Sequence, residues 1–209
     1  MKCYFIAATF LLSHGIAAQI MPDIMIGNKA TEYSFLWVAP VDRKQKFELF
    51  NYTFFSVDYQ KQQRNAHEIY QAVTYKLSNN LGIAAIGRLT FNEFIPQAAI
   101  ALQHYNDYIF LAAYPYVQHS WQNEITSYGL FGFLQWKPKL NEKWRLFTML
   151  MFEPNFANGE HYYSYQQYRI GLQSPTHLQF GVGGTLEQIG PSYLFHYNFG
   201  IFIRKEFLH

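Results

Sequence analysis

The chain has 209 residues, a formal net charge of +2, and a composition that is 50% hydrophobic, 20% aromatic and only 14% charged. Soluble domains carry roughly a quarter charged residues, so a soluble surface would be short of charge here. The small, dispersed positive charge argues against a nucleic-acid partner. The slightly negative mean hydropathy argues against a bundle of membrane helices.

The first 18 residues have the features of a cleaved export signal. Lys2 provides a positive start, residues 4–12 form an apolar run, and small residues end at Ala18. We therefore expect residues 1–18 to be a signal peptide and residues 19–209 to form a single domain. The sole cysteine lies within the signal, so the mature chain has no thiol for a disulfide, a metal site or a nucleophile.

Beyond residue 18, apolar and polar residues alternate in segments of about ten, as in strands that cross a membrane. The segment from Ser192 to Glu206 shows this most clearly. One of its rows consists of Tyr193, Phe195, Tyr197, Phe199, Ile201 and Ile203. Weaker alternation occurs at 178–187, 97–104 and 83–90. We expect the apolar rows to face lipid and the polar rows to face a narrow interior.

The pattern predicts eleven strands between turn sequences. They lie at 33–40, 47–57, 67–77, 82–90, 97–104, 108–117, 124–136, 144–153, 162–173, 177–187 and 192–206. A closed barrel with both ends on one side needs an even number, and Pro22–Asn28 provides a short twelfth strand. We expect an all-β, antiparallel, up-and-down transmembrane barrel of twelve strands. Ten strands is the alternative, if the N-terminal pair does not join the wall.

The connections predict the orientation of the barrel. Short polar turns are expected at 41–46, 78–80, 104–107, 137–143 and 174–177, and longer connections at 58–66, 91–96, 118–123, 154–161 and 188–191. Outer-membrane barrels have short periplasmic turns and longer external loops. We therefore expect both termini to lie in the periplasm and the barrel to contact outer-membrane lipid and lipopolysaccharide.

A secreted soluble β-sandwich or lipocalin-like barrel is the main alternative to a membrane barrel. The strands of such a protein would also alternate between apolar and polar residues. The polar rows would face water, however, and the chain would carry more lysine and glutamate. No charged residue lies between Ser192 and Ile203. The sequence therefore favours the membrane barrel.

The C-terminal segment YNFGIFIRKEF, from Tyr197 to Phe207, resembles the closing strand of bacterial outer-membrane β-barrel proteins. Those strands end in an aromatic residue that follows alternating apolar positions, a region read by the barrel-assembly machinery. Phe207 takes the aromatic role, although Leu208 and His209 follow it. The resemblance is to this class as a whole and implies location and architecture without an activity.

Two groups of residues have the composition of a hydrolytic site. One is Glu160, His161 and Ser164, and the other is His119 with Ser120. A serine nucleophile needs a neutral imidazole within hydrogen-bond reach and a third group to orient it. Alternation from Tyr162 predicts that Ser164 faces lipid, and a short loop makes it difficult for His161 to fold back over that face. We therefore favour a polar loop without catalytic residues.

The rows of side chains predicted to face the interior of the barrel carry charges of both signs. These charged residues are Arg88, Arg145, Arg169, Arg204, Glu153, Glu187 and Glu206. Mixed signs predict ion pairs across the lumen instead of an ion-selective ring. No two histidines recur at a ligand spacing, so we expect no metal and no cofactor.

Three stretches of the predicted strands, 108–117, 128–136 and 144–152, are largely apolar on both faces. This predicts an apolar patch in the lumen, consisting of Phe131, Phe133, Phe147, Met149 and Met151. The patch would either hold a hydrophobic ligand or fill a narrow barrel with side chains. The sequence favours the second.

Three functions are compatible with these features. The one we favour is a structural or interaction role as an accessory subunit of a larger outer-membrane complex, without enzymatic activity. The alternatives are a small channel or carrier for a hydrophobic solute, and a lipid-modifying hydrolase that uses Glu160, His161 and Ser164.

Overall fold

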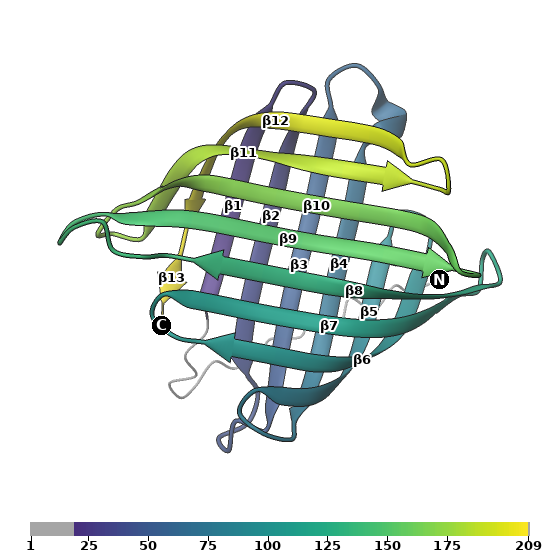
Figure 1. Cartoon of the computed structure of the whole chain (residues 1–209), viewed down its shortest axis with the longest axis horizontal. Coiled ribbons are helices and arrows are strands. Elements are labelled where there is room, and N and C mark those ends of the chain that lie inside the picture. Colours follow the sequence, from purple (N-terminus) through teal and green to yellow (C-terminus); the bar gives the residue numbers. More distant parts are fainter. Residues whose placement is uncertain (1–18, 209) are drawn as a thin grey trace, which may run out of the picture.

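In the computed structural model, residues 19–208 are described, and they form one closed antiparallel barrel (Figure 1). The expected signal peptide lies outside the described residues. The strands are β1 Gln19–Gly27, β2 Ala30–Pro40, β3 Phe47–Asp58, β4 Ala66–Lys76, β5 Leu81–Thr90, β6 Phe94–Tyr105, β7 Ile109–Ser120, β8 Ile125–Trp136, β9 Arg145–Ala157, β10 Glu160–Gln173, β11 Leu178–Ile189 and β12 Leu194–Lys205. Among residues 19–208, no helix is long and apolar enough to cross a membrane.

Each strand pairs with the next one in the sequence, and β12 returns to pair with β1. This confirms the prediction of twelve strands and places the N-terminal pair in the wall. In Figure 1 the strands β6–β10 cross in front of β1–β4 at a steep angle, as tilted strands do on opposite sides of a barrel.

The seam between β1 and β12 is interrupted at Pro22. Asp23 pairs with Arg204, and after a gap Gln19 and Ile20 pair with the short β13 (Phe207–Leu208) in the same register. Proline has no N–H to donate, so the ladder is broken there without a shift. The predicted twelfth strand at 22–28 is therefore longer than expected and begins before this proline.

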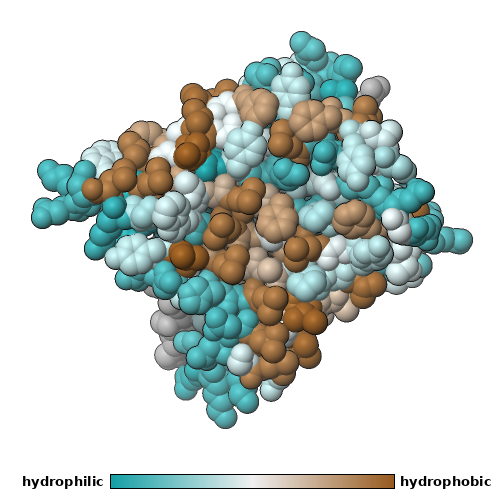
Figure 2. All heavy atoms as spheres, in the orientation of Figure 1, coloured by the Kyte–Doolittle hydropathy of each residue, from teal (hydrophilic) through white to brown (hydrophobic). Residues whose placement is uncertain are grey.

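The exterior of the barrel is apolar and the interior is polar or aromatic, the reverse of a soluble barrel. Ile26, Val182 and Ile201 expose 58%, 57% and 63% of their surface on the outside. Figure 2 shows apolar side chains over the middle of one face and hydrophilic residues at the projecting hairpin ends. Apolar surface costs about 25 cal/mol per Å² in water, so this belt requires lipid around it. The predicted lipid-facing row of the last strand is confirmed.

We expected short connections at the end of the barrel that carries the termini and longer ones at the other end, and this prediction is wrong. At the end away from the termini the connections are 28–29, 59–65, 91–93, 121–124, 158–159 and 190–193, and only 59–65, which contains a 3-10 turn (Gln62–Arg64), exceeds four residues. At the terminal end the longest is 137–144, with eight residues. The strands continue into the segments that we expected to be loops, because their polar residues pair across narrow hairpins.

The middle of the lumen is filled by side chains. Phe50, Tyr70, Tyr114, Phe131 and Phe147 come from five strands around the wall, and at most 1% of the surface of each is exposed. Phe131 stacks on Tyr70 with ring centroids 4.6 Å apart and meets Phe50 edge-on at 5.6 Å. Asp23, Gln167 and Arg169, on the other side of the lumen, are equally buried, so no continuous water path passes these side chains and the barrel is sealed at this depth.

Candidate functional site

A cavity of about 360 Å³ opens at the end of the barrel away from the termini, and we call it the well. Its floor is formed by Tyr52, Phe131 and Met151, which belong to the packed lumen core. Tyr163 and Tyr165 of β10 and Phe54 of β3 line its walls. The well is therefore a blind, aromatic-walled chamber above a sealed floor.

The lining of the well carries more acidic than basic groups. Five carboxylates line it, those of Glu32, Asp58, Glu68, Glu153 and Glu187, against the permanent cations Lys29 and Arg64. The Lys29 ammonium lies 3.3 Å from the ring centroid of Tyr197, as in a cation–π contact.

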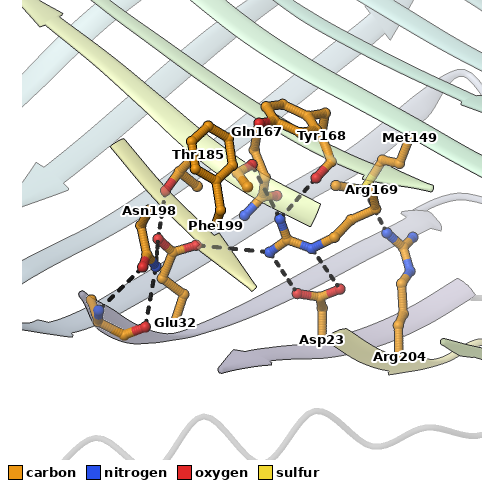
Figure 3. Close-up of polar contacts among 12 residues, drawn as sticks. Asp23, Glu32, Met149, Gln167, Tyr168, Arg169, Thr185, Asn198, Phe199 and Arg204 are labelled. Atoms are coloured by element: carbon orange, nitrogen blue, oxygen red, sulfur yellow. Dashed lines mark hydrogen bonds and ion pairs between the residues drawn. The ribbon is translucent and has the colours of Figure 1, made fainter. Parts of the chain in front are cut away.

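An ion pair under the well joins three strands (Figure 3). The guanidinium of Arg169 on β10 donates to the Asp23 carboxylate on β1 at 3.0 Å and lies 3.8 Å from Glu32 on β2. All three side chains are almost fully buried. The Arg169 side chain passes within 2.5 Å of the point where a Cβ on Gly183 would lie, so only glycine leaves room for it there.

Glu32 is incompletely paired. Its Oε1 accepts hydrogen bonds from the Thr185 hydroxyl at 2.6 Å and the Asn198 amide at 2.8 Å. Its Oε2 has no hydrogen-bond partner among the described residues and meets only the distant Arg169. A buried carboxylate oxygen without a hydrogen-bond donor is costly, so the charge of Glu32 is only partly compensated by Arg169.

A second ion-pair cluster forms the opposite wall of the well. Arg88 on β5 donates to Glu153 at 2.9 Å and to Glu68 at 2.8 Å. The Tyr116 hydroxyl also donates to Glu153 at 2.7 Å. The single positive charge of Arg88 is thus shared between the carboxylates of Glu68 and Glu153. Glu187, by contrast, takes part in no ion pair among residues 19–208.

Another buried ion pair lies at the terminal end of the lumen. Lys137, in the turn after β8, donates to both oxygens of Glu206 at 2.8 Å. Burial lowers the pKa of Lys137, although the Glu206 carboxylate opposes that shift. The predicted ion pairing is confirmed for Arg88, Arg169, Glu153 and Glu206. Among the described residues, the other three predicted inward charges form no ion pair: Glu187, Arg145, which donates to the carbonyl oxygen of Asp107 at 2.8 Å, and Arg204. Arg204 donates to Gln135 at 2.9 Å and to the sulfur atoms of Met21 and Met149.

The predicted apolar patch lies inside the barrel. Phe131, Phe133, Phe147, Met149 and Met151 are all buried. They pack in one continuous core with the rings of β3, β4 and β7 instead of surrounding an empty apolar chamber. Only Phe131 and Met151 reach the well, as part of its floor.

The structure brings His161 and Ser164 together on the outside of the barrel. Tyr163 and Tyr165 line the well, so Ser164 between them faces outward, as alternation predicted. A register shift between His161 and Tyr163 places the imidazole over the same face, with Nε2 2.8 Å from Ser164 Oγ. A short loop was expected to make this contact difficult, but a bulge in β10 supplies the necessary bend.

Other candidate groups are not assembled. Glu160 is exposed at the hairpin, and no hydrogen bond or ion pair joins it to His161 or Ser164 in the described chain. His119 contacts Thr126 at 2.9 Å on the outer face, whereas Ser120 donates to Glu93 on the inner one. Because successive side chains of a strand point to opposite faces, His119 and Ser120 cannot contact each other. Among residues 19–208, no three histidine or carboxylate side chains converge as metal ligands would.

Several residues of the lumen clusters were not predicted from the sequence. Asp23, Glu32, Glu68 and Lys137 pair with the predicted arginines and glutamates. The available signal was an isolated charge within an apolar strand, as at Asp23 between Pro22 and Ile24. A charge in that setting must face the interior and find a partner there.

The fold is that of the outer-membrane β-barrel proteins. The chain is similar in structure to a porin described as NanC, with a TM-score of 0.53, 7% sequence identity, and coverage of 89% of this chain and 98% of the porin. An outer-membrane channel from Pseudomonas putida F1 is less similar, with a TM-score of 0.41, 10% identity, and coverage of 94% and 97%. The sequence matches no protein-family model and no curated protein.

Proposed function

We propose that the protein is an integral barrel of the bacterial outer membrane, with its termini in the periplasm and its well open to the exterior. The apolar outer belt and the lipid-facing Phe207 near the end of the chain support this location. Because the barrel has an even number of strands, both termini lie at the same end of it. The resemblance of the last strand to those read by the assembly machinery supports a periplasmic position for that end.

We further propose that the well binds a small polar solute that carries a positively charged amine. The observation that carries this proposal is the pair of carboxylates, Glu32 and Glu187, that line the well without a full cationic partner. Aromatic rings surround them, and such rings attract cations through their faces. One structural neighbour is described as a porin, but the sealed floor favours binding over passive passage.

Titration calorimetry with the detergent-solubilised barrel tests this proposal. The probes are glucosamine and N-acetylglucosamine, which share a sugar ring and differ in the charge of the amine. We expect glucosamine to bind at least about tenfold more tightly, because an amine facing a carboxylate forms a charge-assisted hydrogen bond.

The matched variants locate the binding. Glu187→Gln should weaken glucosamine binding about tenfold, whereas Glu124→Gln, an exposed carboxylate in the 121–124 hairpin outside the well, should leave it unchanged. Equal affinities for the two sugars, or equal effects of the two substitutions, would contradict a cation-binding well.

The role as an accessory subunit of a larger outer-membrane complex remains a prediction from the sequence. The sealed lumen and short hairpins support it, because they leave no wide conduit or elaborate receptor surface. Co-purification from gently solubilised membranes tests it: a stable partner supports the subunit, and a solitary barrel argues against it. The structure gives no support to the alternative of a channel or carrier for a hydrophobic solute, because the side chains of the apolar patch pack against one another and fill the space that such a solute would occupy.

A further inference from the structure

His161 and Ser164 have the arrangement of a general base and its nucleophile. The Nδ1 atom of His161 lies 2.8 Å from the carbonyl oxygen of Gly190, which can only accept a hydrogen bond. Nδ1 therefore carries the proton, and in the neutral ring Nε2 has the free lone pair. The Ser164 hydroxyl, 2.8 Å away, donates to that lone pair. This is the tautomer in which histidine can take the proton of a serine.

The position of the pair at the membrane matches a lipid ester better than a soluble substrate. Ser164 lies on the lipid-facing side of β10, two residues beyond the bulge and opposite Pro154 and Gln188. Exposed tyrosines flank it, Tyr162 on β10 and Tyr193 in the 190–193 turn. Such aromatic residues mark the depth at which lipid headgroups meet the acyl chains. The acyl ester bonds of lipids lie at this depth.

Tyr193 covers the pair. Its ring stacks on His161 with centroids 4.2 Å apart, while Ser164 and His161 themselves are almost fully buried. Tyr193 has a φ of 53°, in the left-handed region that a bulky residue rarely adopts. Its side chain is half exposed and does not belong to the lumen core.

We propose that Ser164 and His161 form a hydrolytic site for acyl esters of the surrounding lipid, closed by Tyr193. Ser164 Oγ attacks the ester carbonyl carbon as its proton passes to His161 Nε2. The bond from that carbon to the alcohol oxygen then breaks, and the alcohol takes the proton from His161. Water attacks the acyl-serine in the same way and releases the fatty acid. Gln188, the partner of Ser164 in the β10–β11 ladder, and Gln166, two residues along β10, would donate amide N–H groups to the developing oxyanion.

Labelling by an alkyl fluorophosphonate tests the nucleophile. We expect the folded barrel in micelles to be labelled, and Ser164→Ala to abolish the label. His161→Ala should slow labelling by about a hundredfold or more, since a positioned base contributes about that much. Tyr193→Ala should accelerate it by uncovering the pair. Release of fatty acid from phosphatidylethanolamine vesicles should follow the same order.

The matched control is Thr126→Ala, which removes another outward hydroxyl held by a histidine, His119. It should leave labelling unchanged, and heat-modifiable gel migration should show that every variant is folded. Labelling that survives Ser164→Ala would overturn the proposal. So would folded protein that stays unlabelled even with Tyr193→Ala, because the pair would then be only a structural hydrogen bond.

Discussion

Replacement of Arg169 by methionine should lower the free energy of unfolding by about 3–5 kcal/mol. The substitution keeps a long apolar stem in the lumen but removes the cation that faces Asp23 and Glu32. Both carboxylates are almost fully buried, so each would have to be desolvated without a partner or be protonated. The change also removes a contact that joins β10 to β1 and β2 across the lumen.

A double-substitution cycle separates the ion pair from general packing. Asp23→Asn should be costly in the natural chain and much less so beside Arg169→Met, because the cation that needs Asp23 is already gone. Unfolding by urea in micelles, followed by tryptophan fluorescence, gives the four free energies. A cost below about 1 kcal/mol for Arg169→Met would show that the pair contributes little.

Replacement of Phe199 by arginine should cost about 2–4 kcal/mol of stability in a lipid bilayer. Phe199 lies near the middle of β12 and exposes its ring on the outer face. An arginine there places a charge among acyl chains, from which it reaches water only by extending along the barrel wall.

The matched control places the same side chain at the same depth on the inner face. Phe199 pairs with Gly184, and the next residue, Thr185, lines the well beside Glu32. Thr185→Arg removes one hydrogen bond to Glu32 and supplies a cation, so it should cost about 1 kcal/mol or less. Refolding into vesicles at graded urea concentrations measures both. The reverse order would mean that β12 is misassigned by one residue.

The architecture was predictable because period-two alternation is strong wherever a strand has lipid on one side. Ile201 and Phe199 alternate with Gly200 and Asn198, so the register of β12 followed from the sequence alone. The closing pairing of β1 with β12 was predictable from parity, since both ends of a barrel with an even number of strands lie on one side. The inward direction of Arg88, Arg169 and Glu153 followed from the same rule.

The strand ends were not predictable, because the alternation of apolar and polar residues disappears where both faces of a strand contact water. Gln118 and His119 are both polar, and they were assigned to a loop. In the structure Gln118 bridges Gln97 and Ser127 inside the barrel while His119 binds Thr126 outside. A polar rim on a strand has the same composition as a loop, so the predicted lengths of the connections were wrong.

The candidate sites needed three-dimensional information. The well depends on which aromatic rings meet at mid-depth, and its lining comes from strands far apart in the sequence. The contact of His161 with Ser164 depends on a one-residue bulge, for which the sequence provides no clear signal. The sequence shows the residue types, but nothing in it indicates that the two side chains meet across a short hairpin.

Single-barrel conductance in a planar lipid bilayer tests the central claim, that the lumen is sealed between the well and the terminal end. The natural chain should show no steady ionic current at moderate voltage, because Phe131 and its neighbours fill the lumen. Phe131→Ala, which removes a ring stacked on Tyr70 and bordering the well floor, should produce small or flickering openings. A stable, ohmic current through the natural chain would contradict the account.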